Sequence, residues 1–157
     1  MQKQLILRDS IAIHASASRV WEILTSPGET KKYMFGCEAR TDWKTDSPLL
    51  WNTFIDGKEV TLVKGNIIEI EHNRFLAYTM IDPRSGIEDI PDNYLTVSYE
   101  LSVDNELTIL TITQGDFSII ANGLKRYNEA IEEGGWNGIL TMVKDIAEAR
   151  YPHAMPV

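Results

Sequence analysis

The chain has 157 residues, with 15 Lys or Arg and 23 Asp or Glu, so its formal net charge at pH 7 is −8. This acidity argues against a nucleic-acid partner and against docking on an anionic membrane, because both require basic surface. The single cysteine excludes an intramolecular disulfide and a multi-cysteine zinc site. No segment has the apolar length of a membrane span or a signal peptide, so we expect a cytoplasmic protein without membrane insertion.

A strand and two short helices are expected first. Apolar residues alternate along residues 5–13, which predicts a strand that Asp9 interrupts. Ser16 has the position of a helix N-cap, because apolar residues follow it at helical spacing. Ser26-Pro27 starts a second short helix that ends near Tyr33, since proline is favoured at the first helical position.

The middle of the chain reads as successive strands. Residues 49–55 and 60–71 flank Asp56-Gly57, a dipeptide typical of a two-residue hairpin turn. Asn73 supplies the next turn, before a strand over residues 74–81. These segments therefore predict antiparallel strands joined by short turns.

Two further strands are expected on either side of a turn at Asp104-Asn105. Residues 94–104 alternate, which predicts a half-buried strand with one wet face, and residues 106–115 form its partner. The face expected to be buried carries Leu95, Val97, Tyr99, Leu101 and Val103. Residues 82–92, with two prolines, a glycine and four acids, form a loop that either acts as a lid or has no function.

The last element expected is a long amphipathic helix over about residues 122–149, kinked at Gly134-Gly135. Strands and helices are segregated, so the fold class is α+β with an antiparallel sheet of about six to seven strands. Such a sheet curves because strand twist accumulates. A curved sheet around one straight helix leaves space at the helix ends, which is the physical origin of a pocket.

Several stretches resemble the START-like (SRPBCC) domains related to the heat-shock-protein-90 ATPase activator. They are "IAIHASASRVWEILTSPGETKKYMFGCEARTDWKTDSPLLW", "DGKEVTLVKGNIIEIEHNRFLAYTM", "LTVSYEL" with "TILTITQGDF", and "GGWNGILTMVKDI". The likeness covers about residues 5–149, which implies a single START-like domain over 1–157. It implies the helix-grip, or Bet-v-1-like, fold, in which a curved antiparallel sheet wraps around one long C-terminal helix, with two short helices after the first strand.

The resemblance implies less about function, because members of the superfamily bind lipids, hormones or polyketides, and some catalyse cyclisation or hydrolysis. In the family a glycine commonly precedes the Ser-Pro pair, whereas here Asp46 precedes Ser47-Pro48, so the backbone of that turn is expected to differ.

No constellation in the sequence predicts a catalytic or metal site, and we expect no cofactor. His14, His72 and His153 do not have the spacing of metal ligands. Cys37 is expected to be a small buried residue rather than a nucleophile. Glu38, Asp42 and Glu59 are the carboxylates that could act as acid or base if they faced an interior cavity.

Aromatic residues are the better candidates for a binding site. In a helix-grip fold, the segment that holds Phe35 and Trp43 borders the cavity mouth. Trp51 and Phe54 are three apart in one strand and must point to opposite faces, so only one of them can line a cavity. The pocket candidates are Phe35, Trp43, Trp51, Phe54, Tyr78, Met80, Tyr99, Trp136 and Leu140.

Three hypotheses follow. The leading one is the binding of a small, largely apolar or aromatic molecule in a cavity between the sheet and the C-terminal helix. The second is an enzyme on the same scaffold, such as a cyclase, dehydratase or hydrolase, which requires an ionisable group facing the cavity. The third is a protein-interaction role, including stimulation of a chaperone ATPase, which predicts an exposed apolar patch. The sequence leaves homodimerisation open.

Overall fold

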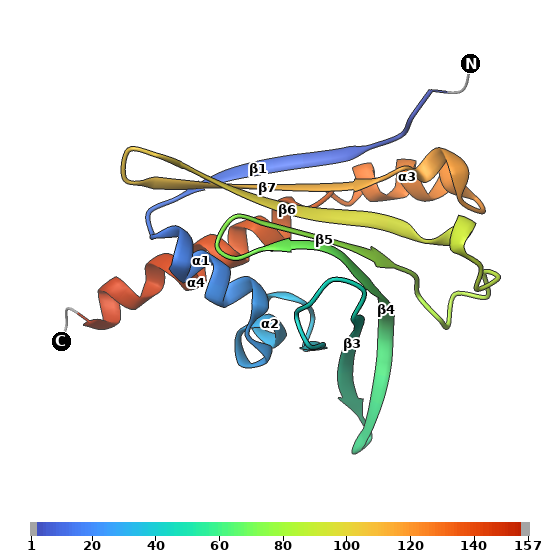
Figure 1. The fold of residues 1–157 in the computed structure, drawn as a ribbon, viewed down its shortest axis with the longest axis horizontal. Coiled ribbons are helices and arrows are strands. Elements are labelled where there is room, and N and C mark those ends of the chain that lie inside the picture. The colour runs from blue at the N-terminus through green and yellow to red at the C-terminus, as the bar shows by residue number, and fades with distance from the viewer. Residues whose placement is uncertain (1–2, 155–157) are drawn as a thin grey trace.

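The computed structural model describes residues 3–154 and contains one sheet of seven antiparallel strands in the order β1-β7-β6-β5-β4-β3-β2 (Figure 1). The strands are β1 (Leu7–Ile13), β2 (Glu38–Arg40), β3 (Pro48–Ile55), β4 (Lys58–Glu71), β5 (Phe75–Met80), β6 (Leu95–Asp104) and β7 (Leu107–Gly115). The helices are α1 (Ala17–Thr25), α2 (Pro27–Tyr33), α3 (Gly123–Glu132) and α4 (Asn137–Ala154). The predicted α+β helix-grip fold is confirmed.

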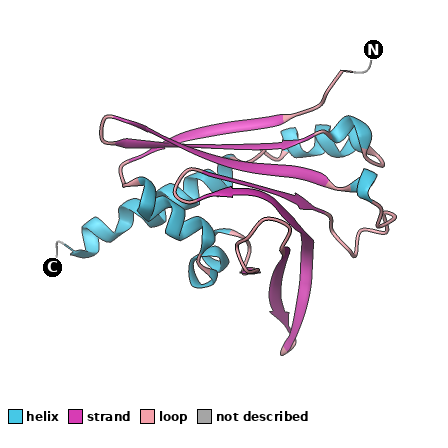
Figure 2. Ribbon diagram, in the orientation of Figure 1, coloured by secondary structure: helices cyan, strands magenta, loops and turns pink. Residues whose placement is uncertain are grey.

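The helices are distributed unevenly over the sheet, as Figure 2 shows. The C-terminal helix α4 packs on β1 and touches both α1 and α2, whereas α3 lies near the far end of β7, close to where α4 begins. Within residues 3–154, none of these helices combines the length and the hydropathy that crossing a bilayer requires.

The long strand β4 is bent by two bulges, and the bend is visible in Figure 1. In β4, Leu62 has no partner in β3 and Ile68 has none in β5, so β4 carries one extra residue at each of these two positions. Such bulges bend a strand and increase its twist. Between them, a Cβ atom on Gly65 would lie 1.7 Å from the Thr79 carbonyl oxygen, so the two strands approach closely only because this residue is glycine.

The predicted turns and caps are present. Asp56 and Gly57 have φ of 52° and 78°, and two positive values are what a type I′ hairpin turn requires. Asn73 and Asn105 also adopt positive φ, at the turns that follow β4 and β6. The Ser16 hydroxyl accepts a hydrogen bond from the Arg19 backbone N–H at 3.1 Å and so caps α1.

The expected helix over residues 122–149 is two helices rather than one kinked helix. Gly134 and Gly135 have φ of 94° and 60°, values that break a right-handed helix. The second helix, α4, starts against the first strand, because the Trp136 backbone N–H donates to the Asp9 carboxylate at 3.0 Å. Asp9, which interrupts the alternation of its strand, therefore satisfies a backbone donor at the start of α4.

Two further details differ from expectation. The buried face of β6 holds four of its five expected residues, but Val103 is 65% exposed, since it lies beside the β6–β7 turn. The three-residue strand β2 was not predicted. It lies in the aromatic-rich segment between α2 and β3, where it pairs with the middle of β3.

Candidate functional site

A cavity of about 220 Å³ lies between the concave face of the sheet, the start of α4 and the connection from α2 to β2. We call it the α4 cavity. Its lining is almost wholly apolar and consists of Met34, Phe35, Cys37, Trp51, Leu62, Val63, Tyr78, Met80, Val97, Gln114, Trp136 and Ile139.

The bulge in β4 explains why two neighbouring residues of one strand, Leu62 and Val63, both line this cavity. In a regular strand, adjacent side chains point to opposite faces, and a bulge suspends that alternation. On β3, Trp51 lines the cavity and is buried, whereas Phe54 is 63% exposed near the hairpin tip. The two residues thus point to opposite faces, and Phe54 is outside the cavity.

Polar atoms in the wall are paired with one another. The hydroxyls of Tyr78 and Tyr99 lie 2.7 Å apart, with the rings edge to face and their centroids 5.6 Å apart. Burial raises the pKa of both phenols above the ordinary value, so both stay neutral at neutral pH. The indole Nε1–H of Trp136 donates to Oε1 of Gln114 at 3.0 Å, which ties α4 to β7.

The only cysteine, Cys37, lines the cavity and is buried, as expected. Desolvation raises the pKa of its thiol above the ordinary value, because the interior disfavours the thiolate. A neutral thiol is a poor nucleophile. Cys37 therefore acts as a small apolar wall residue.

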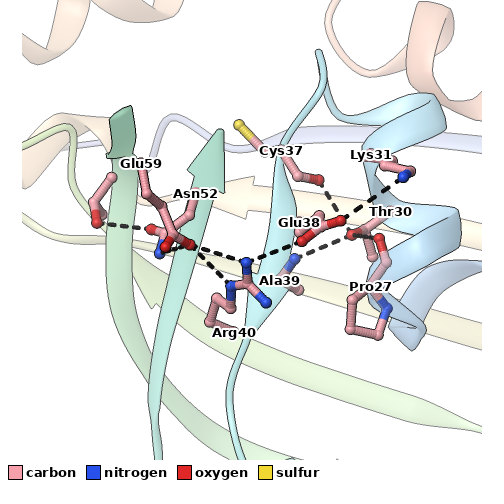
Figure 3. Close-up of polar contacts among 10 residues, drawn as sticks. Pro27, Thr30, Lys31, Cys37, Glu38, Ala39, Arg40, Asn52 and Glu59 are labelled. Atoms are coloured by element: carbon pink, nitrogen blue, oxygen red, sulfur yellow. Dashed lines mark hydrogen bonds and ion pairs between the residues drawn. The ribbon is translucent and has the colours of Figure 1, made fainter. Parts of the chain in front are cut away.

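The rim of the cavity is held by the buried residue Thr30 of α2. Its hydroxyl accepts from the Ala39 backbone N–H at 3.1 Å and lies within hydrogen-bonding distance of the carbonyl oxygens of Cys37 and Pro27 (Figure 3). One side chain thus ties α2 to the start of β2 and fixes the segment between them. Phe35 sits in this segment with φ of 52° and is 79% exposed, so it forms part of the mouth of the cavity rather than its interior.

Two of the candidate catalytic carboxylates lie in a surface network next to this rim (Figure 3). Arg40 contacts Glu38 at 3.1 Å and Glu59 at 3.0 Å, and Asn52 donates to Glu59 at 3.0 Å. The hydrogen bonds from Asn52 and Arg40 lower the pKa of Glu59, which is the opposite of what a general acid needs. None of the three carboxylates lines the cavity, because these two serve the network and Asp42 is exposed.

A second hollow of about 610 Å³ lies on the outside of the molecule, between α1 and the β4–β5 turn. We call it the α1 groove. Six of its nine lining residues have polar or charged side chains, and the lining consists of Ser18, Trp21, Glu22, Thr25, Ser26, Trp43, Ile70, His72 and Asn73. Trp43 adopts φ of 57° and lines this groove instead of the cavity mouth, so its expected place is wrong. His72 contacts Trp21 edge to face at 5.9 Å between ring centroids.

Five of the nine pocket candidates line the α4 cavity, and they are Phe35, Trp51, Tyr78, Met80 and Trp136. Two more lie close to it, because the Tyr99 hydroxyl is hydrogen-bonded to that of Tyr78 and Leu140 is buried in the core one turn after Trp136. Gln114 was not among the predicted site residues. The alternation along β7 could have indicated it, since Gln114 shares a face of this strand with the buried residues Leu110 and Ile112.

The loop over residues 82–92 does not contribute to the cavity lining, so of the two alternatives for this loop, the lid has no support in its position. The loop is anchored to the sheet, because Asp89 pairs with Lys64 and accepts a hydrogen bond from the Tyr94 hydroxyl at 2.6 Å. In the part of the chain that the structure describes, no group of three or more His, Cys, Asp or Glu side chains converges where a metal ion could be held.

Residues 14–148 match the family described as "Activator of Hsp90 ATPase homolog 1-like protein". The chain belongs to this family. Asp46, which precedes Ser47-Pro48, adopts φ of 72°, a left-handed value that glycine takes readily. No curated protein matches the chain at a significant level.

Solved structures share the fold over nearly the full chain. The protein ChR145 from Cytophaga hutchinsonii is 29% identical, with a TM-score of 0.75, and the alignment covers 97% of this chain and 99% of that one. The Aha1 dimer from Colwellia psychrerythraea is 15% identical with a TM-score of 0.65, over 91% of this chain and 96% of that one. PFC0360w, an HSP90 activator from Plasmodium falciparum, is 14% identical with a TM-score of 0.60, over 88% of this chain and 96% of that one.

Proposed function

We propose that the protein binds a small, largely apolar or aromatic molecule in the α4 cavity. The observation that carries the proposal is a lining of twelve residues, none of them charged, around about 220 Å³ of space. Burying apolar surface there is favourable by about 25 cal/mol per Å². An engineered cavity of about 150 Å³ in another protein holds benzene, and drug-sized ligands occupy about 300 Å³ or more. The cavity therefore suits a molecule of one or two rings.

The ionisable groups of the lining favour binding over acid–base catalysis. They are the Cys37 thiol and the Tyr78 phenol, and burial raises the pKa of both. Neither group exchanges a proton readily near neutral pH, whereas a general acid or base works best with a pKa near the working pH.

Calorimetric titration with indane, a neutral two-ring hydrocarbon, tests this proposal. The wild-type chain is expected to bind indane with a dissociation constant below about 1 mM. Val63→Trp places an indole into the cavity from β4 and is expected to abolish the heat of binding. Val103→Trp is the matched control, because it makes the same substitution at an exposed strand position outside the cavity.

The control variant should bind indane as the wild type does. Equal binding by the wild type and Val63→Trp would contradict the proposal, since the ligand would then occupy another part of the molecule. Absence of binding by the wild type would also contradict it. Circular dichroism on each variant separates loss of the cavity from loss of the fold.

A second candidate function is stimulation of a chaperone ATPase, and one surface feature favours it. On α3, Leu124 and Ile131 lie two turns apart on one face and are both exposed, and the exposed Ile119 precedes the helix. Such a patch suits protein contact, and the family to which the chain belongs is described as "Activator of Hsp90 ATPase homolog 1-like protein". The test is the ATPase rate of a heat-shock-protein-90 chaperone with wild type and with Leu124→Asp/Ile131→Asp, where stimulation only by the wild type is expected. Unchanged ATPase rates with the wild type would dismiss this candidate.

A further inference from the structure

We propose that the side-chain amide of Gln114 makes the α4 cavity selective for neutral one- or two-ring molecules that carry a hydrogen-bond-accepting oxygen, such as an aryl ketone. The inference rests on the proposed function and adds the chemistry of the ligand to it.

The orientation of the Gln114 amide is fixed by its partner. The indole Nε1–H of Trp136 can only donate, and the amide oxygen of Gln114 lies 3.0 Å from it. The amide oxygen must therefore face the indole, and the amide NH₂ must face the other way. An amide whose oxygen and nitrogen were exchanged would set two donors against each other.

The amide NH₂ of Gln114 meets a weak acceptor in the present arrangement. Its Nε2 lies 3.2 Å from the thioether sulfur of Met80, which also lines the cavity. Thioether sulfur accepts hydrogen bonds only weakly, whereas a carbonyl oxygen is a full acceptor. The methionine side chain is flexible, so it can yield its place to a ligand atom.

The other polar atoms of the wall are held by better partners. The Tyr78 hydroxyl lies 2.7 Å from the hydroxyl of the fully buried Tyr99, and the Trp136 Nε1–H is already hydrogen-bonded to Gln114. A ligand oxygen beside Gln114 thus gains a hydrogen bond while its rings contact apolar side chains. This combination selects one polar edge on an apolar body.

The absence of charge among the lining residues sets the second condition on the ligand. A carboxylate or an ammonium group would lose its hydration in the cavity without an opposite charge to compensate. The ligand is therefore neutral. With about 220 Å³ of space, it has one or two rings rather than the extended chain of a lipid.

The test compares 1-indanone with indane, which have the same ring skeleton and differ at the ketone, by calorimetric titration at pH 8. The measured quantity is the ratio of the two dissociation constants in each variant. Gln114 is half-buried, so in Gln114→Glu at pH 8 the carboxylate is expected to stay in contact with water and ionised; it then still accepts from the Trp136 indole but offers no donor. The ratio is expected to shift toward indane by roughly fivefold or more, which is the size of one ordinary hydrogen bond.

Met80→Leu serves as the matched variant, because it removes the sulfur and leaves the amide donor in place. It is expected to show no shift toward indane. A ratio that is the same in the wild type and in Gln114→Glu would overturn this inference while indane binding still supported the proposed function. Failure of both compounds to bind the wild type would overturn the proposed function and this inference with it.

Discussion

The α4 cavity and the α1 groove are each lined by two tryptophans. Trp51 and Trp136 line the α4 cavity, and Trp21 and Trp43 line the α1 groove. The groove is almost three times larger, at about 610 Å³ against about 220 Å³. Six of its nine lining residues are polar or charged, whereas the cavity has no charged lining residue. Volume alone therefore does not mark the binding site. An apolar ligand binds favourably only where its own apolar surface and that of the protein are both removed from water.

The difference comes from where the tryptophans stand in the fold. Trp136 directly precedes α4, and it is held by Asp9 through its backbone N–H and by Gln114 through its indole. Trp43 lies in the connection between β2 and β3, where its backbone N–H meets the Thr41 hydroxyl at 3.4 Å. One tryptophan therefore forms part of the wall of the apolar α4 cavity, and the other borders the α1 groove, whose lining residues are mostly polar or charged.

The largest difference between the two regions should appear on removing these tryptophans. Trp136→Ala is expected to lower the free energy of unfolding by about 4 kcal/mol, because it opens a buried space and leaves Gln114 without its partner. Trp43→Ala, at a half-buried position, should cost only about 1 kcal/mol. Urea denaturation of both variants measures this. Equal losses would show that the groove is as well packed as the cavity wall.

The cap at the start of α4 should contribute the next largest effect. Asp9→Ala removes the carboxylate that accepts from the Trp136 backbone N–H, with an expected loss of about 2 kcal/mol of stability. Asp42→Ala, in the exposed connection near Trp43, removes the same charge and should change stability by less than about 0.5 kcal/mol. Denaturant midpoints of Asp9→Ala, Asp42→Ala and the wild type, measured at one pH, test this prediction. An Asp9→Ala variant with unchanged stability would show that the start of α4 does not depend on its hydrogen bond to β1.

Cys37 reports on the cavity without any mutation, because the chain has one cysteine. Burial raises its thiol pKa, so at a given pH the thiolate fraction is smaller than in the unfolded chain. At pH 8, iodoacetamide should alkylate the native protein at least about tenfold more slowly than the protein in denaturant, with a rate that still rises above about pH 9. Indane bound in the cavity should slow the alkylation of the native protein further. Native labelling as fast as in denaturant would show that the thiol is not buried in the native protein.

The smallest effect concerns two glycines. Gly135 has φ of 60°, and a Cβ there would lie 2.6 Å from the Asp9 carboxylate, so Gly135→Ala should destabilise by about 1.5 kcal/mol. Gly28, in α2, has nothing within 4 Å of a Cβ, so Gly28→Ala should stabilise by about 0.5 kcal/mol. Thermal unfolding of the two variants measures whether each substitution raises or lowers the stability. A Gly135→Ala variant that is as stable as the wild type or more stable would contradict the break between α3 and α4.

The fold was predictable because its signals are local. Alternation along β6, the Asp56-Gly57 turn and the Ser16 cap each depend on neighbours in the sequence. The resemblance to the START-like domains points to the same element order. The Gly134-Gly135 pair was read as a kink, because sequence alone does not give the sign of φ; both residues adopt positive values and end the helix.

The site was less predictable because its contacts are long-range. In the sequence, Gln114 is an ordinary polar residue of a strand. Its role depends on the Trp136 indole, which only the folded structure brings next to it. Parity placed Trp51 and Phe54 on opposite faces but did not decide which one faces in. Trp43 turned out to lie in the groove because its positive φ redirects the connection, and no local pattern reports that conformation.

The central claim, that the α4 cavity and not the larger α1 groove binds a small apolar molecule, is tested most directly with the four tryptophan indole signals. In a ¹⁵N–¹H NMR titration of the wild-type chain with 1-indanone, the indole signals of Trp136 and Trp51 should shift with saturation. Those of Trp21 and Trp43 should stay in place. Saturable shifts at Trp21 and Trp43 with Trp136 and Trp51 unmoved would contradict the account.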